Sequence, residues 1–215
     1  MSHLIIHRGI VNKQSKENLL KSFKQSFKKG YGVETDIHAT KDNQFICFHD
    51  FTLKRIFKKN LSVKNLNYSK INEISTKLGR PIPLLKDLLK SSKNKYAIFI
   101  EIKTLFSKFL LKKLLKETSK FTKCVFISFK HENIYKLLSI KKNTKVGLSF
   151  CPPTSVKKII EKSKNRKINF LILDKFYLNN KKIENLNIKK FYYTIRSKSE
   201  FSKFKKDNNL IFENL

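Results

Sequence analysis

Acidic side chains are scarce in this sequence, so the places where they stand close together are informative. The 215 residues include 16 Asp and Glu against 48 Lys and Arg. Glu34 and Asp36 are two apart in a strand-like segment, which puts both carboxylates on one face of a strand. Glu101 and Lys103 repeat this spacing in a later segment. Spacing alone leaves two interpretations open: a metal site, or ion pairs with the abundant lysines.

Two histidines directly follow apolar runs, at the points where strands would end. His7 precedes Arg8 and Gly9, and His49 precedes Asp50. Beside the carboxylates, these residues supply an acid, a base, a cation site and an anion clamp at one rim of a fold. The other histidines are interpreted as structural: His3, His38 and His131.

The elements that must position these side chains are short apolar or alternating runs. Eight runs predict strands: Leu4–Ile6, Val33–Ile37, Phe45–Phe48, Tyr96–Ile102, Cys124–Phe129, Lys145–Phe150, Ile168–Leu173 and Lys190–Ile195. Segments with helical spacing, such as residues 19–30, separate most of them. Strand and helix alternate, which predicts a parallel α/β sheet. Eight such units, with no glycine-rich dinucleotide turn, favour a (β/α)8 TIM-type barrel over an open doubly wound sheet.

One link departs from this pattern. Six residues separate His38 from Phe45, whereas a parallel crossover needs about a dozen. We therefore expect an irregular link between the second and third strands, either a hairpin-like excursion or a barrel unit that has lost its helix. Residues 54–83 are predicted to be a loop-rich insertion carrying one short helix. Because no linker or internal repeat is visible, we predict a single domain over residues 1–215.

The net charge of +32 suggests nucleic-acid or membrane binding, but its distribution argues against a dedicated nucleic-acid surface. Lysines run evenly from Lys13 to Lys206, and the chain contains five arginines. The cysteines number three and have no C-x-x-C spacing, which predicts neither a disulfide framework nor a structural zinc site. No leader or membrane-spanning run is recognisable, so we expect a cytoplasmic protein. Attachment to an anionic bilayer surface through lysines stays open.

The ordered motifs of the chain resemble the glycerophosphodiester phosphodiesterase family. The first half carries the specific part of this resemblance: His7-Arg8-Gly9, Glu34-x-Asp36, His49-Asp50 and Glu101-x-Lys103. In the second half the likeness is weaker and is carried by Ile127-Ser128-Phe129 and Tyr193-Thr194-Ile195. The closing Ile211-Phe212-Glu213-Asn214 differs from the family's Thr-Asp-x-Pro, which bears on substrate fit more than on catalysis.

The resemblance implies a role for each group of candidate residues. One divalent cation, calcium or magnesium and alternatively manganese, would be held by residues similar to Glu34, Asp36 and Glu101. His7 and His49 would be the general acid–base pair, and Arg8 and Lys103 would bind the phosphate. Phe129 and Tyr193 could form a wall against the alcohol moiety, or could equally be core packing. Hard carboxylate oxygens without thiolates suit such a cation.

Two neighbouring residues have open roles. Asn18 could contact phosphate or cap a helix, and we favour the helix N-cap. Asp50 could orient His49 by accepting its ring N–H, or only shape the loop.

The function that the resemblance implies is hydrolysis of glycerophosphodiesters to sn-glycerol 3-phosphate and an alcohol, in lipid and glycerol metabolism. The alternatives are a lysophospholipase D-type lipid phosphodiesterase and a catalytically dead basic protein that binds nucleic acid or a membrane surface. Under the first hypothesis we expect a small-molecule substrate, no specific nucleic-acid partner and weak association with anionic membranes.

Overall fold

The predicted barrel is present and closed. The computed structural model describes residues 3–13 and 15–213. Its eight parallel strands are β1 (Leu4–His7), β2 (Gly32–Ala39), β4 (Ile98–Ile102), β5 (Cys124–Ser128), β6 (Val146–Phe150), β7 (Phe170–Asp174), β8 (Lys189–Ile195) and β9 (Asn209–Phe212). Strand β1 pairs with β9 on one side and β2 on the other, which closes the sheet. The (β/α)8 prediction is therefore confirmed.

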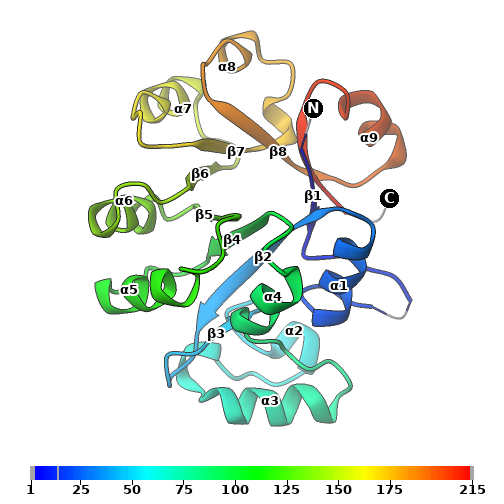
Figure 1. Ribbon diagram of the computed structural model, residues 1–215. Helices are drawn as coiled ribbons and strands as arrows, with labels where there is room; N and C mark the ends of the chain where they lie inside the picture. The colour runs from blue at the N-terminus through cyan, green and yellow to red at the C-terminus, as the bar shows by residue number, and fades with distance from the viewer. Residues whose placement is uncertain (1–2, 14, 214–215) are drawn as a thin grey trace.

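Helices that follow the strands surround the barrel (Figure 1). They are α1 (Leu20–Lys28), α4 (Leu85–Ser92), α5 (Lys108–Glu117), α6 (His131–Ile140), α7 (Val156–Ser163), α8 (Lys181–Glu184) and α9 (Lys198–Phe204). The helical spacing in residues 19–30 gives α1, whose Phe23 and Phe27 are buried in the core. Within the described part of the chain, no helix is both long and apolar enough to cross a membrane.

The irregular link between the second and third predicted strands is a hairpin. Strand β3 (Phe45–Cys47) runs antiparallel to β2, with Ile37 opposite Cys47 and Ala39 opposite Phe45. A hairpin needs only a short turn, and the turn here spans residues 40–44. Of the two expected explanations, the hairpin-like excursion is therefore the correct one. Because β3 returns along β2, the residues that follow β3 lie beside the carboxyl-terminal half of β2.

The chain from residue 45 to residue 84, here called the β3 excursion, has a small core of its own. It contains α2 (Lys54–Phe57), the 3-10 helix η1 (Val63–Asn65) and α3 (Tyr68–Lys77), so the expectation of one short helix was wrong. The side chains of β3 alternate: Phe45 and Cys47 join the main core, whereas Ile46 and Phe48 pack in the small one. The same small core buries Ile71, whose burial could not be predicted from the polar sequence around it.

The eighth barrel strand, β9, was missed in the sequence. It is four residues long, and its only large apolar residues are Leu210, Ile211 and Phe212. These three residues follow a stretch rich in lysine and asparagine. The helical pattern before them is less clear than the patterns before the other strands. Its pairing with both β1 and β8 gives the strand its structure, and the β1 residues that it pairs with lie at the other end of the chain.

The inside of the barrel is apolar at one end and polar at the other. Inward-facing residues form a cluster of large side chains: Ile5, Phe99, Val125, Ile127, Ile172, Phe191 and Ile211. Phe99 and Phe191 are in ring contact at 4.7 Å between centroids. Two residues further along β1 and β4, polar groups replace these side chains: His7 comes after Ile5, and Glu101 comes after Phe99. The interior therefore forms an apolar floor beneath a polar cavity at the carboxyl ends of the strands.

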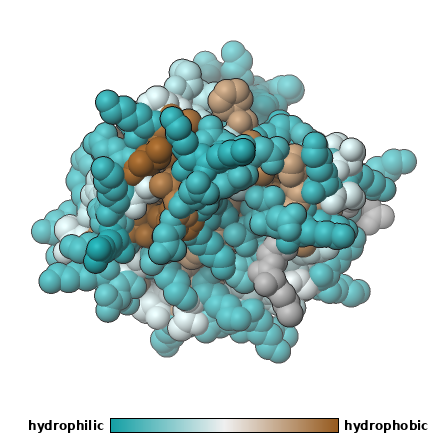
Figure 2. Space-filling view, turned by 90° about the horizontal axis from the view of Figure 1, so that it is seen from above, coloured by the Kyte–Doolittle hydropathy of each residue, from teal (hydrophilic) through white to brown (hydrophobic). Residues whose placement is uncertain are grey.

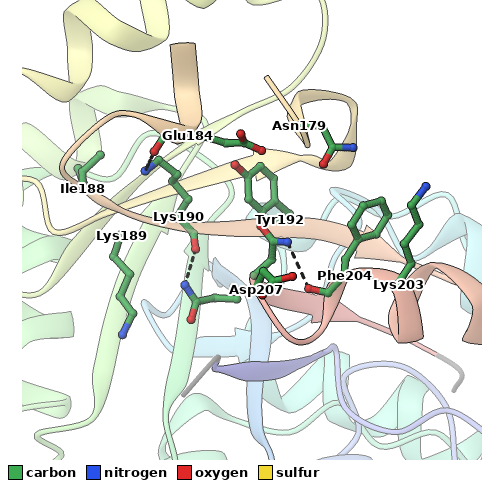
Figure 3. A pocket seen from close by; sticks show the side chains of 11 residues that line it. Asn179, Glu184, Ile188, Lys189, Lys190, Tyr192, Lys203, Phe204 and Asp207 are labelled. Atoms are coloured by element: carbon green, nitrogen blue, oxygen red, sulfur yellow. Dashed lines mark hydrogen bonds between the residues drawn. The ribbon is translucent and has the colours of Figure 1, made fainter. Parts of the chain in front are cut away.

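One face of the molecule is predominantly hydrophilic (Figure 2). Figure 2 shows a face covered by such side chains, with a smaller group of hydrophobic side chains exposed among them. A hollow of about 660 Å³ lies outside the barrel beside the start of β8 (Figure 3). In it, Lys190 Nζ donates hydrogen bonds to the carbonyl oxygens of Glu184 and Leu186. This hollow lies at the amino ends of β8 and β9, away from the polar cavity.

Candidate active site

The residues singled out in the sequence converge at the carboxyl ends of the strands. A cavity of about 300 Å³ opens there, lined by His7, Arg8, Glu34, His49, Glu101, Lys103, Ile127, Phe129, Ser149, Cys151, Ile172, Asp174, Tyr193, Thr194, Arg196 and Ile211. Asp36 is not on this lining but binds both Arg8 and Lys103 directly. The structure thus brings together every predicted catalytic, phosphate-binding and metal-binding residue. The larger hollow beside β8 contains none of them.

Three carboxylates form a compact cluster at the base of the cavity. Glu34, Asp36 and Glu101 each offer an oxygen atom, and these atoms lie within 4.8 Å of one another. The register explains this proximity, because Asp36 on β2 stands directly beside Glu101 on β4. Glu34 and Asp36 are 3% and 1% exposed, so the cluster is shielded from water. Three carboxylates this close require positive charge nearby.

Two cations neutralise the cluster unevenly. Arg8 Nε lies 2.9 Å from Asp36 Oδ2, and Lys103 Nζ lies 3.2 Å from Asp36 Oδ1 and 2.7 Å from Glu101 Oε1. Burial alone would raise the pKa of Asp36, but Arg8 and Lys103 hold it well below its usual range. Burial, reinforced by the charges of Asp36 and Glu101, instead raises the pKa of Glu34. Asp36 is therefore paired with two basic side chains, whereas Glu34 is paired with neither of them.

The surroundings of the Glu34 carboxylate are those expected of a metal ligand. Its Oε2 is buried without a hydrogen-bond partner in the described structure. The nearest basic atom, Nε2 of His7, is 3.8 Å away. A buried carboxylate oxygen left in this condition costs free energy unless a cation binds it. The donor set consists of carboxylate oxygens, which suits Ca²⁺, Mg²⁺ or Mn²⁺. The residues present thus fit a divalent cation held by Glu34, Asp36 and Glu101.

The turn after β1 holds His7 and Arg8 in place. Arg8 and Gly9 have φ values of 55° and 76°, and the backbone N–H of Arg8 donates to the carbonyl oxygen of Glu34. Two consecutive left-handed residues reverse the chain and point Arg8 back over the cluster. A Cβ at position 9 would lie 2.9 Å from the backbone and Cβ of Ser22 on α1. The glycine in the His-Arg-Gly motif is thus required by both its backbone conformation and its close packing.

Gly9→Ala is expected to destabilise the protein more than Gly30→Ala. Gly30 is also left-handed, at φ 82°, but a Cβ there meets nothing within 4 Å. Gly30→Ala should therefore cost only the backbone strain, about 1–2 kcal/mol. Gly9→Ala adds a steric overlap with α1 and should also lower kcat/KM by displacing His7 and Arg8. Denaturant unfolding and kinetics of both variants test this, and equal losses of stability would contradict the proposed overlap.

Each cavity histidine is backed by a carboxylate. Nδ1 of His7 lies 2.9 Å from Oε2 of Glu213, and Nδ1 of His49 lies 2.7 Å from Oδ1 of Asp50. With Nδ1 occupied, Nε2 is the ring atom left to exchange protons. Burial lowers the pKa of His49, which favours its neutral ring at pH 7. Arg55 holds Asp50 in turn, with its Nε 2.6 Å from Oδ2.

The remaining histidines have structural contacts, as far as the described residues show. Nε2 of His38 lies 3.1 Å from the carbonyl oxygen of His49, and Nε2 of His131 lies 2.9 Å from that of Ser149. Burial lowers the pKa of both His38 and His131, so each is favoured as a neutral, hydrogen-bonded ring. His3 lies outside the cavity, near Phe191 at the start of the barrel.

Asn18 does not cap α1, which corrects the expectation from the sequence. The helix is preceded by Leu19, and no side chain caps it. Asn18 instead adopts φ 56°, donates a hydrogen bond from Nδ2 to Asp36 Oδ2 over 3.2 Å and accepts one from Thr35 Oγ1 over 2.8 Å. It is 2% exposed, so it supports the acidic cluster from below. An N-cap would have required Asn18 to adopt extended backbone, which its left-handed turn prevents.

Aromatic residues line one side of the cavity. Phe129 and Tyr193 meet edge to face with centroids 6.0 Å apart. The Tyr193 hydroxyl donates to the carbonyl oxygen of Phe150 over 2.9 Å, so its ring is fixed. Phe129 remains 38% exposed at the mouth. Both rings therefore face the cavity, as a wall against part of a substrate would.

One residue of the site had no signal in the sequence beyond its place in the closing motif. Glu213 follows β9 and pairs with both His7 and Arg196. The hydrogen bond from His7 lowers the pKa of Glu213 to about 2, despite partial burial. An unrecognised strand hid this residue, because strand-end logic cannot be applied where no strand is predicted. Asn214 of the same motif lies outside the described residues.

Fold and site together define the class of the protein: a β/α-barrel enzyme with an acidic cluster and two carboxylate-backed histidines at its carboxyl end. The chain belongs to the glycerophosphoryl diester phosphodiesterase family, whose model matches residues 7–209. The comparison with this family confirms the resemblance that the motifs indicated.

Individual relatives agree with this assignment. An uncharacterized protein of Mycoplasma genitalium is 27% identical over 96% of this chain and 92% of its own length. A Caldanaerobacter subterraneus protein named glycerophosphodiester phosphodiesterase is 26% identical over 68% of this chain and 66% of its own. The solved structure of an Oleispira antarctica phosphodiesterase with its product sn-glycerol-3-phosphate superimposes with a TM-score of 0.84, at 16% identity, over 98% of this chain and 92% of that one. At this identity the last likeness shows the fold.

Proposed function

We propose that the protein, as one catalytic domain over residues 1–215, hydrolyses glycerophosphodiesters to sn-glycerol 3-phosphate and an alcohol. The observation that carries this proposal is the pair of carboxylate-backed histidines, His7 and His49, which line the same cavity as Glu34, Glu101 and two cations. A catalytically dead binding protein has no need of this complete set. The family supports the same reaction.

The cations supply electrostatic stabilisation. A phosphodiester is a monoanion that gains charge as it becomes five-coordinate. Arg8 and Lys103 line the cavity and are held by Asp36, so their charges are fixed before substrate arrives. Although burial opposes it, Asp36 and Glu101 raise the pKa of Lys103, which keeps this side chain protonated. Preorganised positive charge of this kind is worth most where charge develops in the transition state.

The histidines transfer the protons. One ring takes a proton from the nucleophile, and the other gives a proton to the leaving alkoxide. Glu213 and Asp50 keep each ring in one orientation through its Nδ1. The nucleophile is either water or the glycerol hydroxyl, which would pass through a cyclic phosphate. Either route uses the same two rings.

A divalent cation would bind Glu34, Asp36 and Glu101. The unpartnered Oε2 of Glu34 and the all-oxygen donor set support this assignment, with Ca²⁺, Mg²⁺ and Mn²⁺ as candidates. When bound, such an ion would supply Lewis acidity toward phosphate oxygens. The divalent cation and its three carboxylate ligands are thus part of the proposed mechanism.

A lysophospholipase D-type activity is the second candidate. Phe129 at the mouth is 38% exposed and offers an apolar surface next to the cavity, which suits a substrate that retains an acyl chain. We place either reaction in the cytoplasm, where free thiols such as Cys47, Cys124 and Cys151 persist. Recovery of phosphate and polyol from lipid headgroups, with weak association to anionic membranes, completes the proposal.

Release of glycerol 3-phosphate from a panel of substrates tests the function. We expect turnover of glycerophosphocholine, glycerophosphoethanolamine, glycerophosphoglycerol or glycerophosphoinositol, and loss of that turnover with a chelator. Lysophosphatidylcholine in the same panel separates the second candidate, since its product would be a lysophosphatidic acid. His49→Ala serves as the inactive control for contaminating enzymes. Failure to cleave any of these diesters, with divalent ions present, would refute both candidates.

A further inference from the structure

Large apolar side chains that face solvent gather at the catalytic end of the barrel. Seven such side chains are exposed among the described residues, and five of them lie in the connections that follow β3, β4, β5 and β7 or in the first turn of α5: Phe51, Leu105, Phe109, Phe129 and Phe176. We call these five the apolar rim. The other two, Leu61 and Leu78, lie further along the β3 excursion. In the described structure, the helix-to-strand connections at the opposite end contribute none.

Two rings of the apolar rim pack against buried neighbours although they are exposed. The ring of Phe51 packs edge-on against buried His38 at 5.3 Å, and the ring of Phe176 packs edge-on against buried Tyr177 at the same centroid distance. Their exposed fractions are nevertheless 58% and 72%. Keeping several such rings in water is unfavourable, and exposed patches that surround a cavity are typical of binding surfaces. The rim thus offers exposed apolar side chains at the same end of the barrel as the cavity, with Phe129 on the cavity lining itself.

The charges beside the rim are positive. Lys108 and Lys130 lie next to rim residues in the chain, and Lys54 lies three positions after Phe51. None of the three has a carboxylate within ion-pair distance in the described structure. Several acidic groups at this end are already paired with basic partners: Glu17 and Asp50 with Arg55, Glu200 with Lys175, and Glu213 with Arg196. Asp174 instead accepts the backbone N–H of Phe176. A partner for this end should therefore be both apolar and anionic.

We propose that the catalytic end docks on an anionic lipid surface, with the apolar rim inserted between headgroups and the neighbouring lysines on lipid phosphates. The inference rests on the proposed function, because an enzyme that acts on lipid-derived phosphodiesters would turn its cavity toward the lipid surface. Lysines elsewhere on the chain attract an anionic bilayer without orienting the protein. The rim supplies the orientation, since apolar insertion is possible only at this end. A lipid that retains an acyl chain would then meet the cavity without leaving the surface.

A single tryptophan can report this docking, because the chain contains none. We expect the fluorescence of the Phe176→Trp variant to shift to shorter wavelength on adding vesicles of phosphatidylcholine mixed with phosphatidylglycerol. The shift should be much smaller with pure phosphatidylcholine and should weaken with added salt, which screens the lysines. The matched control is Leu78→Trp: Leu78 is 52% exposed but lies off the rim, and its tryptophan should not shift.

Sedimentation with the same vesicles measures affinity. Leu105→Ser and Leu78→Ser remove the same side chain at similar exposure, 56% and 52%. Leu105→Ser should weaken binding by about tenfold, and adding Phe176→Ser should weaken it by about tenfold again. Leu78→Ser should bind as the wild type does. All three proteins should hydrolyse a water-soluble glycerophosphodiester at the same rate, since none of these residues belongs to the catalytic machinery.

The outcomes separate the docking from the reaction. Equal shifts at positions 176 and 78, or equal binding of the two leucine variants, would overturn the docking while leaving hydrolysis untouched. A shift of Trp at position 176 with duplex DNA in place of vesicles would assign the rim to nucleic acid and also overturn it. If the soluble diester is not hydrolysed but the rim-specific shift is seen, docking stands and the proposed function fails.

Discussion

Replacing His49 with alanine is expected to lower kcat/KM for a glycerophosphodiester by about 10²–10⁴-fold, the usual contribution of a positioned acid or base. His49 lines the cavity, and its Nδ1 is fixed by Asp50. The variant should keep its fold, because Asp50 retains Arg55 as a partner. An acid and a base that act in one step give a bell-shaped pH dependence, so His49→Ala should also lose one limb of that profile. Steady-state kinetics measured across a range of pH test both the fall in kcat/KM and the change in the pH profile.

The control for this variant is His131→Ala. His131 also has a ring nitrogen near a carbonyl oxygen and a pKa lowered by burial, but it does not line the cavity. Its replacement should leave kcat/KM nearly unchanged. Near-normal turnover in His49→Ala, or an equal loss in His131→Ala, would rule out the mechanism with two histidines.

Removal of divalent ions, or Glu34→Gln, is expected to lower turnover by about 10³-fold, since a bound cation typically contributes several kcal/mol to the transition state. Readdition of the ion should restore the wild type only. Stability gives a second readout: wild-type protein should gain about 2.7 kcal/mol at an ion concentration about 100 times Kd, and Glu34→Gln should lose this gain. Without ions, Glu34→Gln should be the more stable protein, because it removes a buried carboxylate whose ionised form is disfavoured.

Glu132→Gln is the matched control for the metal prediction. Glu132 is exposed on α6 and pairs with Lys136 at 2.6 Å, so its replacement removes the same charge far from the cluster. It should keep both the ion-dependent gain of stability and full turnover. Unimpaired activity of exhaustively chelated wild type, with no ion-induced rise in Tm, would exclude the metal site.

The sequence predicted the barrel and the convergence of its site for a definable reason. Inward-facing residues two apart on a strand share a face, so Glu34 with Asp36 and Glu101 with Lys103 could be placed without coordinates. Parallel strands end at one rim, which brings His7 near them. These inferences use local periodicity and the common direction of the strands, and both are visible in a single chain.

Other features depend on contacts that local patterns do not contain. Strand β9 owes its structure to pairing with β1, at the other end of the chain. Asn18 lies one residue before the N-cap position of α1, and its left-handed backbone turns it toward Asp36. Glu213 reaches His7 across 206 positions of sequence. Such contacts can be found once the closed sheet is known, since closure places the last strand beside the first.

The two histidines proposed as the acid–base pair belong to segments that pack in different cores. His7 ends a strand of the barrel, whereas His49 follows β3, whose side chains alternate between the barrel core and the small core of the β3 excursion. Substitutions within the small core can therefore reshape the surroundings of His49 while β1, β2 and β4 keep the acidic cluster unchanged. The excursion and the barrel could accordingly accumulate substitutions separately, the excursion around His49 and the barrel around the acidic cluster.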